Sequence, residues 1–130
     1  MSKSPLDWSE VMAWFGGIPR FHDNEVISID LRRDPEPSVI RLRAFRMTPE
    51  VDSRGYYVLD KHATVMFTLK GILEQELDGW NHQNAIMNLE ITEVDTGWRL
   101  EMDPAYGVGG YFIAESITMK IEPVVEANES

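Results

Sequence analysis

Apolar residues recur at helical spacing only near the start of the chain, at Leu6, Val11, Met12, Trp14 and Phe15. Ser4 and Pro5 supply a hydroxyl N-cap and a first-turn proline, which predict that a helix begins there and runs to about Phe15. A glycine pair and Pro19 follow, and this combination ends a helix. Because the apolar stripe is broad, we expect the helix to lie flat on an apolar surface.

The period of the pattern changes from helical spacing to two after this helix. Seven alternating stretches are typical of strands with one buried face, at residues 26–31, 40–45, 63–69, 73–78, 87–92, 98–102 and 112–121. The alternation places Ile27 on the core side of the first stretch and Met87 on the core side of the fifth. In the last stretch the inward set changes near Glu115-Ser116, as a bulge produces.

No helical stretch separates these strands, so short connections and antiparallel pairing are expected. The sequence therefore predicts an α+β fold, in which the N-terminal helix packs on a curled, mostly antiparallel sheet of about seven strands. All of residues 1–130 fit a single domain. Within it we expect an irregular, mobile loop at 48–61, in which residues 56–59 could form a short edge strand, and a frayed acidic tail at 122–130. The open edges of such a sheet could pair with a second copy, so a dimer is one expectation.

Composition narrows the class of protein. The chain contains no cysteine, which excludes a disulfide framework and a thiolate metal site and suits a reducing compartment. Its first residues lack the apolar core of a signal peptide, and no apolar run approaches membrane-spanning length. We therefore expect a cytoplasmic protein with no membrane partner.

The net charge of −10 is unevenly distributed along the chain. Residues 1–70 carry ten Lys/Arg and ten Asp/Glu, whereas residues 71–130 carry two and twelve. A surface of this sign repels phosphate backbones, so no nucleic-acid partner is expected, and it attracts basic proteins. Acidic surfaces also keep proteins soluble, so charge alone favours neither a partner nor its absence.

Five carboxylates are predicted on one side of neighbouring strands: Glu74, Glu76, Asp78, Glu90 and Glu101. We call this set the acidic face. Arg99 is the one basic residue expected among them, so the carboxylates should repel one another. An ordinary solvated strand face is the plain alternative to a binding surface.

The residues His22, Asp23 and Glu25 bring titratable groups to the start of the first strand. Histidine with carboxylates is common in acid–base and metal sites, and His82, in another polar loop, could approach His22. Neighbours in an extended segment point to opposite faces, however, and no further ligand lies nearby. We therefore expect neither a catalytic residue nor a metal or other cofactor, while keeping an enzyme built on His22, Asp23 and His82 as the alternative.

A polar connection at 79–84 contains Asn81, His82, Gln83 and Asn84, which can donate and accept hydrogen bonds as a ligand pocket requires. A loop that ties down its own backbone amides would use the same residues. Trp80 lies in this connection. The four tryptophans are most simply core residues, but an exposed one would be a natural interface anchor.

Three segments of the chain together resemble the immunity protein 50 family of bacterial polymorphic toxin systems. The opening segment, 14–26, contains Phe21-His22-Asp23-Asn24-Glu25-Val26. The central segment, 79–84, contains Asn81-His82-Gln83-Asn84, and the glycine-rich segment is 104–112. The resemblance implies a non-enzymatic cytoplasmic protein that neutralises a cognate toxin by binding it. The acidic face would then be the contact, and a basic toxin would fit it best.

Overall fold

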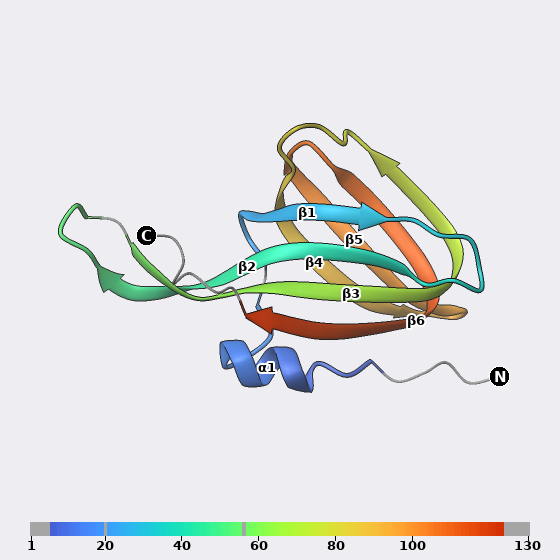
Figure 1. Ribbon diagram of the computed structural model, residues 1–130, viewed down its shortest axis with the longest axis horizontal. Coiled ribbons are helices and arrows are strands. Elements are labelled where there is room, and N and C mark those ends of the chain that lie inside the picture. Colours follow the sequence, from blue (N-terminus) through green and yellow to red (C-terminus); the bar gives the residue numbers. More distant parts are fainter. Residues whose placement is uncertain (1–5, 20, 56, 124–130) are drawn as a thin grey trace.

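The computed structural model describes residues 6–19, 21–55 and 57–123 as one short helix and a closed antiparallel β-barrel (Figure 1). The elements are α1 (Ser9–Phe15), β1 (Asn24–Asp30), β2 (Ser38–Val51), β3 (Tyr57–Asp78), β4 (Ala85–Val94), β5 (Gly97–Tyr106) and β6 (Gly109–Pro123). Around the barrel the strands follow the order β1-β2-β3-β6-β5-β4. All pairs are antiparallel, as the lack of crossover helices predicts.

The predicted α+β fold, a helix packed on a curled sheet of about seven strands, is wrong. The described chain is mostly strand with one helix, and the sheet closes because β1 pairs with β4 at Asn24 and Glu25. The stretches 63–69 and 73–78, predicted as two strands, are both part of β3. Gly71, at φ +68°, lets that strand bend without ending.

The irregular loop predicted at 48–61 is also wrong for most of its length. β2 continues to Val51 and β3 begins at Tyr57, so that a hairpin projects from the barrel (Figure 1). Of the predicted tail at 122–130, Glu122 and Pro123 belong to β6. Residues 124–130 lie outside the described part of the chain, as do Ser4 and Pro5, where the helix was expected to begin.

Two bulges turn predicted core residues outward. On β1 the register shifts between Val26 and Ser28, so Val26 is buried and Ile27 is 44% exposed. On β4 a shift after Ile86 buries that residue and leaves Met87 47% exposed. Each bulge adds one residue to its strand, which moves the following side chains to the other face.

The core fills the barrel and extends to α1, which lies beside β6 (Figure 1). Its largest fully buried side chains are Phe21, Phe67, Phe112, Ile40, Leu42, Leu69, Ile86, Leu100, Met102 and Ile117. The helix contributes buried Val11 and Phe15, as its apolar stripe predicts, and ends at Gly16, whose φ is +82°. Glu10 Oε2 accepts a hydrogen bond of 2.8 Å from the backbone N–H of Ile121, which fastens the helix to β6. Within the described residues, no helix has the length and apolar character needed to cross a membrane.

Candidate functional site

Asn84 joins the three segments that carry the family resemblance. Its side chain is buried, and Oδ1 accepts hydrogen bonds from the backbone N–H groups of Asn81 (2.9 Å) and Val108 (3.0 Å). Nδ2 donates to the carbonyl oxygen of Asn81 at 2.8 Å. The backbone oxygen of Asn84 accepts the N–H of Val26, also at 2.8 Å. One residue of the central segment thus holds the glycine-rich segment on one side and the opening segment on the other.

The contact between the central and glycine-rich segments requires glycine at position 107. Gly107 has φ +85°, and a Cβ there would lie 2.3 Å from the carbonyl oxygen of Gln83. Any side chain would force these two backbones apart. The glycines of this segment therefore permit close packing of loops.

The opening segment forms a tight junction between α1 and β1. Phe21 and Asp23 both have left-handed backbones, at φ 60° and 62°, which is rare for non-glycine residues. The buried ring of Phe21 lies 6.4 Å from that of Trp8 and 5.8 Å from that of Phe67, measured between centroids. This packing holds Phe21 in its unusual conformation and closes the space between the helix and the barrel.

The histidines of the two polar motifs make separate contacts. His22 Nδ1 lies 2.9 Å from the carbonyl oxygen of Met87, and Nε2 lies 3.4 Å from Asp23 Oδ2. His82 Nδ1 lies 3.0 Å from Asn81 Oδ1, and its ring contacts Tyr106. Across the described ranges, no three His, Cys, Asp or Glu side chains gather in a way that could hold a metal ion.

The remaining motif residues have backbone or surface roles. Glu25 is exposed and lies in β1 opposite Arg43, while Gln83 is exposed in the loop and Asn81 caps its own turn. Asn24 is buried, and its Oδ1 has no hydrogen-bond partner. The motif residues thus act mainly on loop structure, which is the plainer of the two interpretations that their sequence allows.

The acidic face is organised by the register of four adjacent strands. Glu90 of β4 lies opposite Glu101 of β5, Glu101 lies opposite Tyr111 of β6, and Tyr111 lies opposite Glu76 of β3. Directly opposed residues point to the same side of a sheet, so these four side chains form one row. The three carboxylates of the row are exposed, as are Glu74 and Asp78 on β3.

Arg99 and Tyr111 order the centre of this face. The Arg99 guanidinium lies 4.0 Å from the centre of the Tyr111 ring, and its Nε lies 3.5 Å from Glu101 Oε1. The Tyr111 hydroxyl donates a hydrogen bond to Glu74, and this bond raises the pKa of the phenol above its usual value. Sequence reasoning missed Tyr111, although its position beside Phe112 on an alternating strand marks it as outward-facing.

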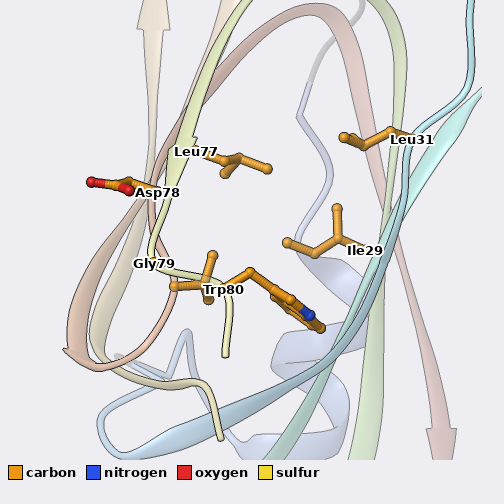
Figure 2. A pocket seen from close by; sticks show the side chains of 7 residues that line it. Ile29, Leu31, Leu77, Asp78, Gly79 and Trp80 are labelled. Atoms are coloured by element: carbon orange, nitrogen blue, oxygen red, sulfur yellow. The ribbon is translucent and has the colours of Figure 1, made fainter. Parts of the chain in front are cut away.

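An apolar pocket of about 400 Å³ lies behind the acidic side of β3. Figure 2 shows Ile29 and Leu31 of the β1 side facing Leu77 of β3, with the ring of Trp80 below Ile29 and Asp78 pointing away. Val108, held by Asn84, also lines the pocket. Trp80 is 54% exposed, so it is the exposed tryptophan that the sequence left open as an interface anchor.

A comparison with protein families finds a match that covers most of the chain. The family model described as immunity protein 50 matches residues 8–124, a range that includes the central and glycine-rich segments and all of the acidic face. Searches of curated proteins and of solved structures found no match. Because the match spans nearly the whole sequence, the chain belongs to the immunity protein 50 family.

Proposed function

We propose that this chain neutralises a cognate bacterial toxin by direct contact through the acidic face, Glu74, Glu76, Asp78, Glu90 and Glu101. Its family is one of immunity proteins, which supports a toxin as the partner in general terms. The contact surface and the basic character of the toxin are our inferences from charge. The protein acts in the cytoplasm of the cell that needs protection.

The observation that supports this proposal best is the row of Glu90, Glu101, Tyr111 and Glu76 across four strands. Like charges placed directly opposite each other, as Glu90 and Glu101 are, destabilise a sheet by up to about 1 kcal/mol per pair. A basic partner removes this repulsion when it binds. The repulsion thus becomes part of the affinity for a basic surface, while it disfavours acidic partners.

The centre of the row also has the residues that make strong contacts at interfaces. Tyr111 is half-buried and held from both sides, by Glu74 through its hydroxyl and by Arg99 through its ring. A side chain that is already ordered loses little conformational entropy on binding. Aromatic and arginine residues of this kind often contribute most of the binding energy. The surrounding carboxylates then steer the encounter and set its orientation.

The test uses the toxin encoded beside this chain in its own genome, produced in a bacterial host under separate control. Co-expression of the wild-type chain should restore growth, and the two proteins should co-purify. The triple variant Glu76→Lys, Glu90→Lys and Glu101→Lys should lose both effects. A matched control, Glu122→Lys, changes an exposed carboxylate of β6 outside the acidic face and should protect like the wild type.

Retained protection by the triple variant, with the toxin still bound, would contradict the acidic face as the contact. Absence of any toxin that binds the wild-type chain would contradict the proposed function as a whole. Among the described contacts, the alternative enzyme built on His22, Asp23 and His82 has in its favour only the 3.4 Å approach of His22 Nε2 to Asp23 Oδ2. The other histidine, His82, contacts Asn81 and not His22.

A further inference from the structure

The second half of β3 has one unpaired edge. β2 pairs with β3 only as far as Ser38 and Leu69, whereas β6 pairs with β3 up to Asp78. From residue 72 to residue 78, the edge away from β6 therefore has no strand partner among the described residues. In Figure 1 this part of β3 turns upward past the end of β1. Ile29 and Leu31 line the apolar pocket from one side and Leu77 lines it from the other. An unpaired edge presents backbone N–H and C=O groups that another strand can bind.

The two faces of this edge differ in chemistry. Gln75 and Leu77 face the inside, where Leu77 lines the pocket with Ile29 and Trp80. Glu74, Glu76 and Asp78 alternate with them and are exposed, so they point outward, as Figure 2 shows for Asp78. A strand added here would place every second side chain over the apolar pocket and the others beside the carboxylates. Apolar residues suit the positions over the pocket, and lysine or arginine suits the positions beside the carboxylates.

We infer that this edge binds an extended segment of the partner in which apolar and basic residues alternate. The segment adds a strand to β3, its apolar side chains enter the pocket beside Trp80 and Leu77, and its basic side chains pair with Glu74, Glu76 and Asp78. Main-chain hydrogen bonds supply affinity, and the pocket and the carboxylates supply specificity. This inference rests on the proposed function for the identity of the partner, but not for the existence of the binding edge.

The same charges argue against a second copy of this chain as the occupant. Pairing two such edges would bring Glu74, Glu76 and Asp78 of both copies together on one side of the joined sheet. Charged side chains on an edge strand are a known protection of sheets against self-association. A basic strand meets no such repulsion.

The first test uses a synthetic probe, a short acetylated peptide in which lysine and leucine alternate. Titration into the 15N-labelled full chain should shift the amide signals of 72–78 and of Ile29 and Leu31 and should slow hydrogen exchange along 72–78. Two control peptides should bind at least about tenfold more weakly, a difference of about 1.4 kcal/mol. One has the same composition with its lysines and leucines in separate blocks, and the other is the alternating peptide with N-methylated amides.

Variants of the chain locate the binding edge. Leu77→Thr and Trp80→Ala should each weaken binding of the alternating peptide several-fold. Met87→Ala removes an exposed apolar side chain outside the pocket and should have no effect. Thermal unfolding of each variant checks that the fold persists. Equal binding of the block and alternating peptides would overturn the inference. A dimer of the free protein that Leu77→Thr abolishes would overturn it in favour of a second copy.

The toxin from the growth assay separates this inference from the proposed function. If Leu77→Thr and Trp80→Ala weaken toxin binding and Met87→Ala does not, the result would support both the binding edge and the proposed function. Toxin binding that is unchanged in both pocket variants would overturn the binding edge and leave the proposed function intact. Peptide binding at 72–78 without any toxin partner would support the edge and contradict the function.

Discussion

The buried Oδ1 of Asn84 accepts the backbone N–H of Val108 at 3.0 Å, and this bond joins two loops that lie 24 residues apart in the sequence. The same oxygen also accepts the N–H of Asn81. Since Val108 lines the apolar pocket and Asn81 belongs to the turn beside Trp80, Asn84 sets the position of one end of that pocket.

Replacement of Asn84 by alanine should strongly destabilise the fold, because it leaves the N–H of Val108 buried without a partner and frees the Asn81 turn. We expect the free energy of unfolding to fall by about 3 kcal/mol in urea denaturation. Asn88→Ala is the matched control, since Asn88 makes one exposed hydrogen bond, to Asp103, and its loss should change stability by less than about 1 kcal/mol. Similar losses in the two variants would refute the assigned role of Asn84.

Replacement of Gly107 by alanine should be much more damaging than replacement of Gly55. Both glycines have positive φ, +85° and +87°, so both variants suffer the left-handed backbone penalty of about 1–2 kcal/mol. Only at position 107 would the new Cβ also collide with a backbone oxygen, because nothing lies within 4 Å at position 55. Thermal denaturation should show a clearly lower midpoint for Gly107→Ala than for Gly55→Ala. Equal midpoints would mean that the loops can separate freely.

The Glu74→Gln variant should lower the pKa of Tyr111 toward its ordinary value. The hydrogen bond to the charged Glu74 carboxylate is the main cause of the raised pKa, and a neutral amide oxygen accepts a weaker bond. The raised pKa means that the neutral phenol stabilises the folded state below the ordinary pKa of tyrosine. That contribution is lost as pH rises through the pKa of the folded protein. Tyrosine ring carbons observed by NMR over an alkaline titration would report the pKa. Glu90→Gln, which alters the same face without contacting Tyr111, should leave it nearly unchanged.

The pKa of Asp30 is lowered by its hydrogen bond to Arg32, with Nε 3.0 Å from Oδ1. A lowered pKa in the folded state stabilises the fold above the ordinary aspartate pKa, and this contribution disappears as pH falls through the lower, folded value. Arg32→Gln should therefore bring the NMR-measured pKa of Asp30 back toward its ordinary value. Since the pair is exposed, stability at neutral pH should change little. An unaltered Asp30 pKa would show that another group lowers it.

Stretches in which the alternation is uninterrupted were predictable from sequence, whereas the bulges of β1 and β4 were not. On β2 and β3 the inward residues Ile40, Leu42, Val65 and Phe67 are buried as their pattern predicts. The bulges of β1 and β4 exchange the two faces locally, and no residue type in those strands requires a bulge. Barrel closure depends on a single two-residue pairing, so it is a property of the whole fold and has no local pattern.

The candidate site also combines features that were predictable from the sequence with features that were not. The common orientation of Glu90 and Glu101 follows from alternation and a hairpin turn, both visible in the sequence. The place of Tyr111 between Glu101 and Glu76 depends on β6 lying between β5 and β3. In this order β3 is followed by β6 and not by β4, which cannot be deduced from neighbouring residues. The apolar pocket exists because β2 begins at Ser38, opposite Leu69, and leaves the rest of β3 unpaired on that side within the described chain. This starting point is also set by strand register, which the sequence does not show.

The central claim is that carboxylates of the acidic face bring the toxin to this protein. It is tested most directly by the association rate constant with the purified toxin, measured by stopped flow over a range of salt concentrations. For the wild-type chain the rate should fall steeply as salt rises, and the triple variant Glu76→Lys, Glu90→Lys and Glu101→Lys should associate at least about tenfold more slowly at low salt. Equal rates with equal salt dependence for the two proteins would contradict the claim.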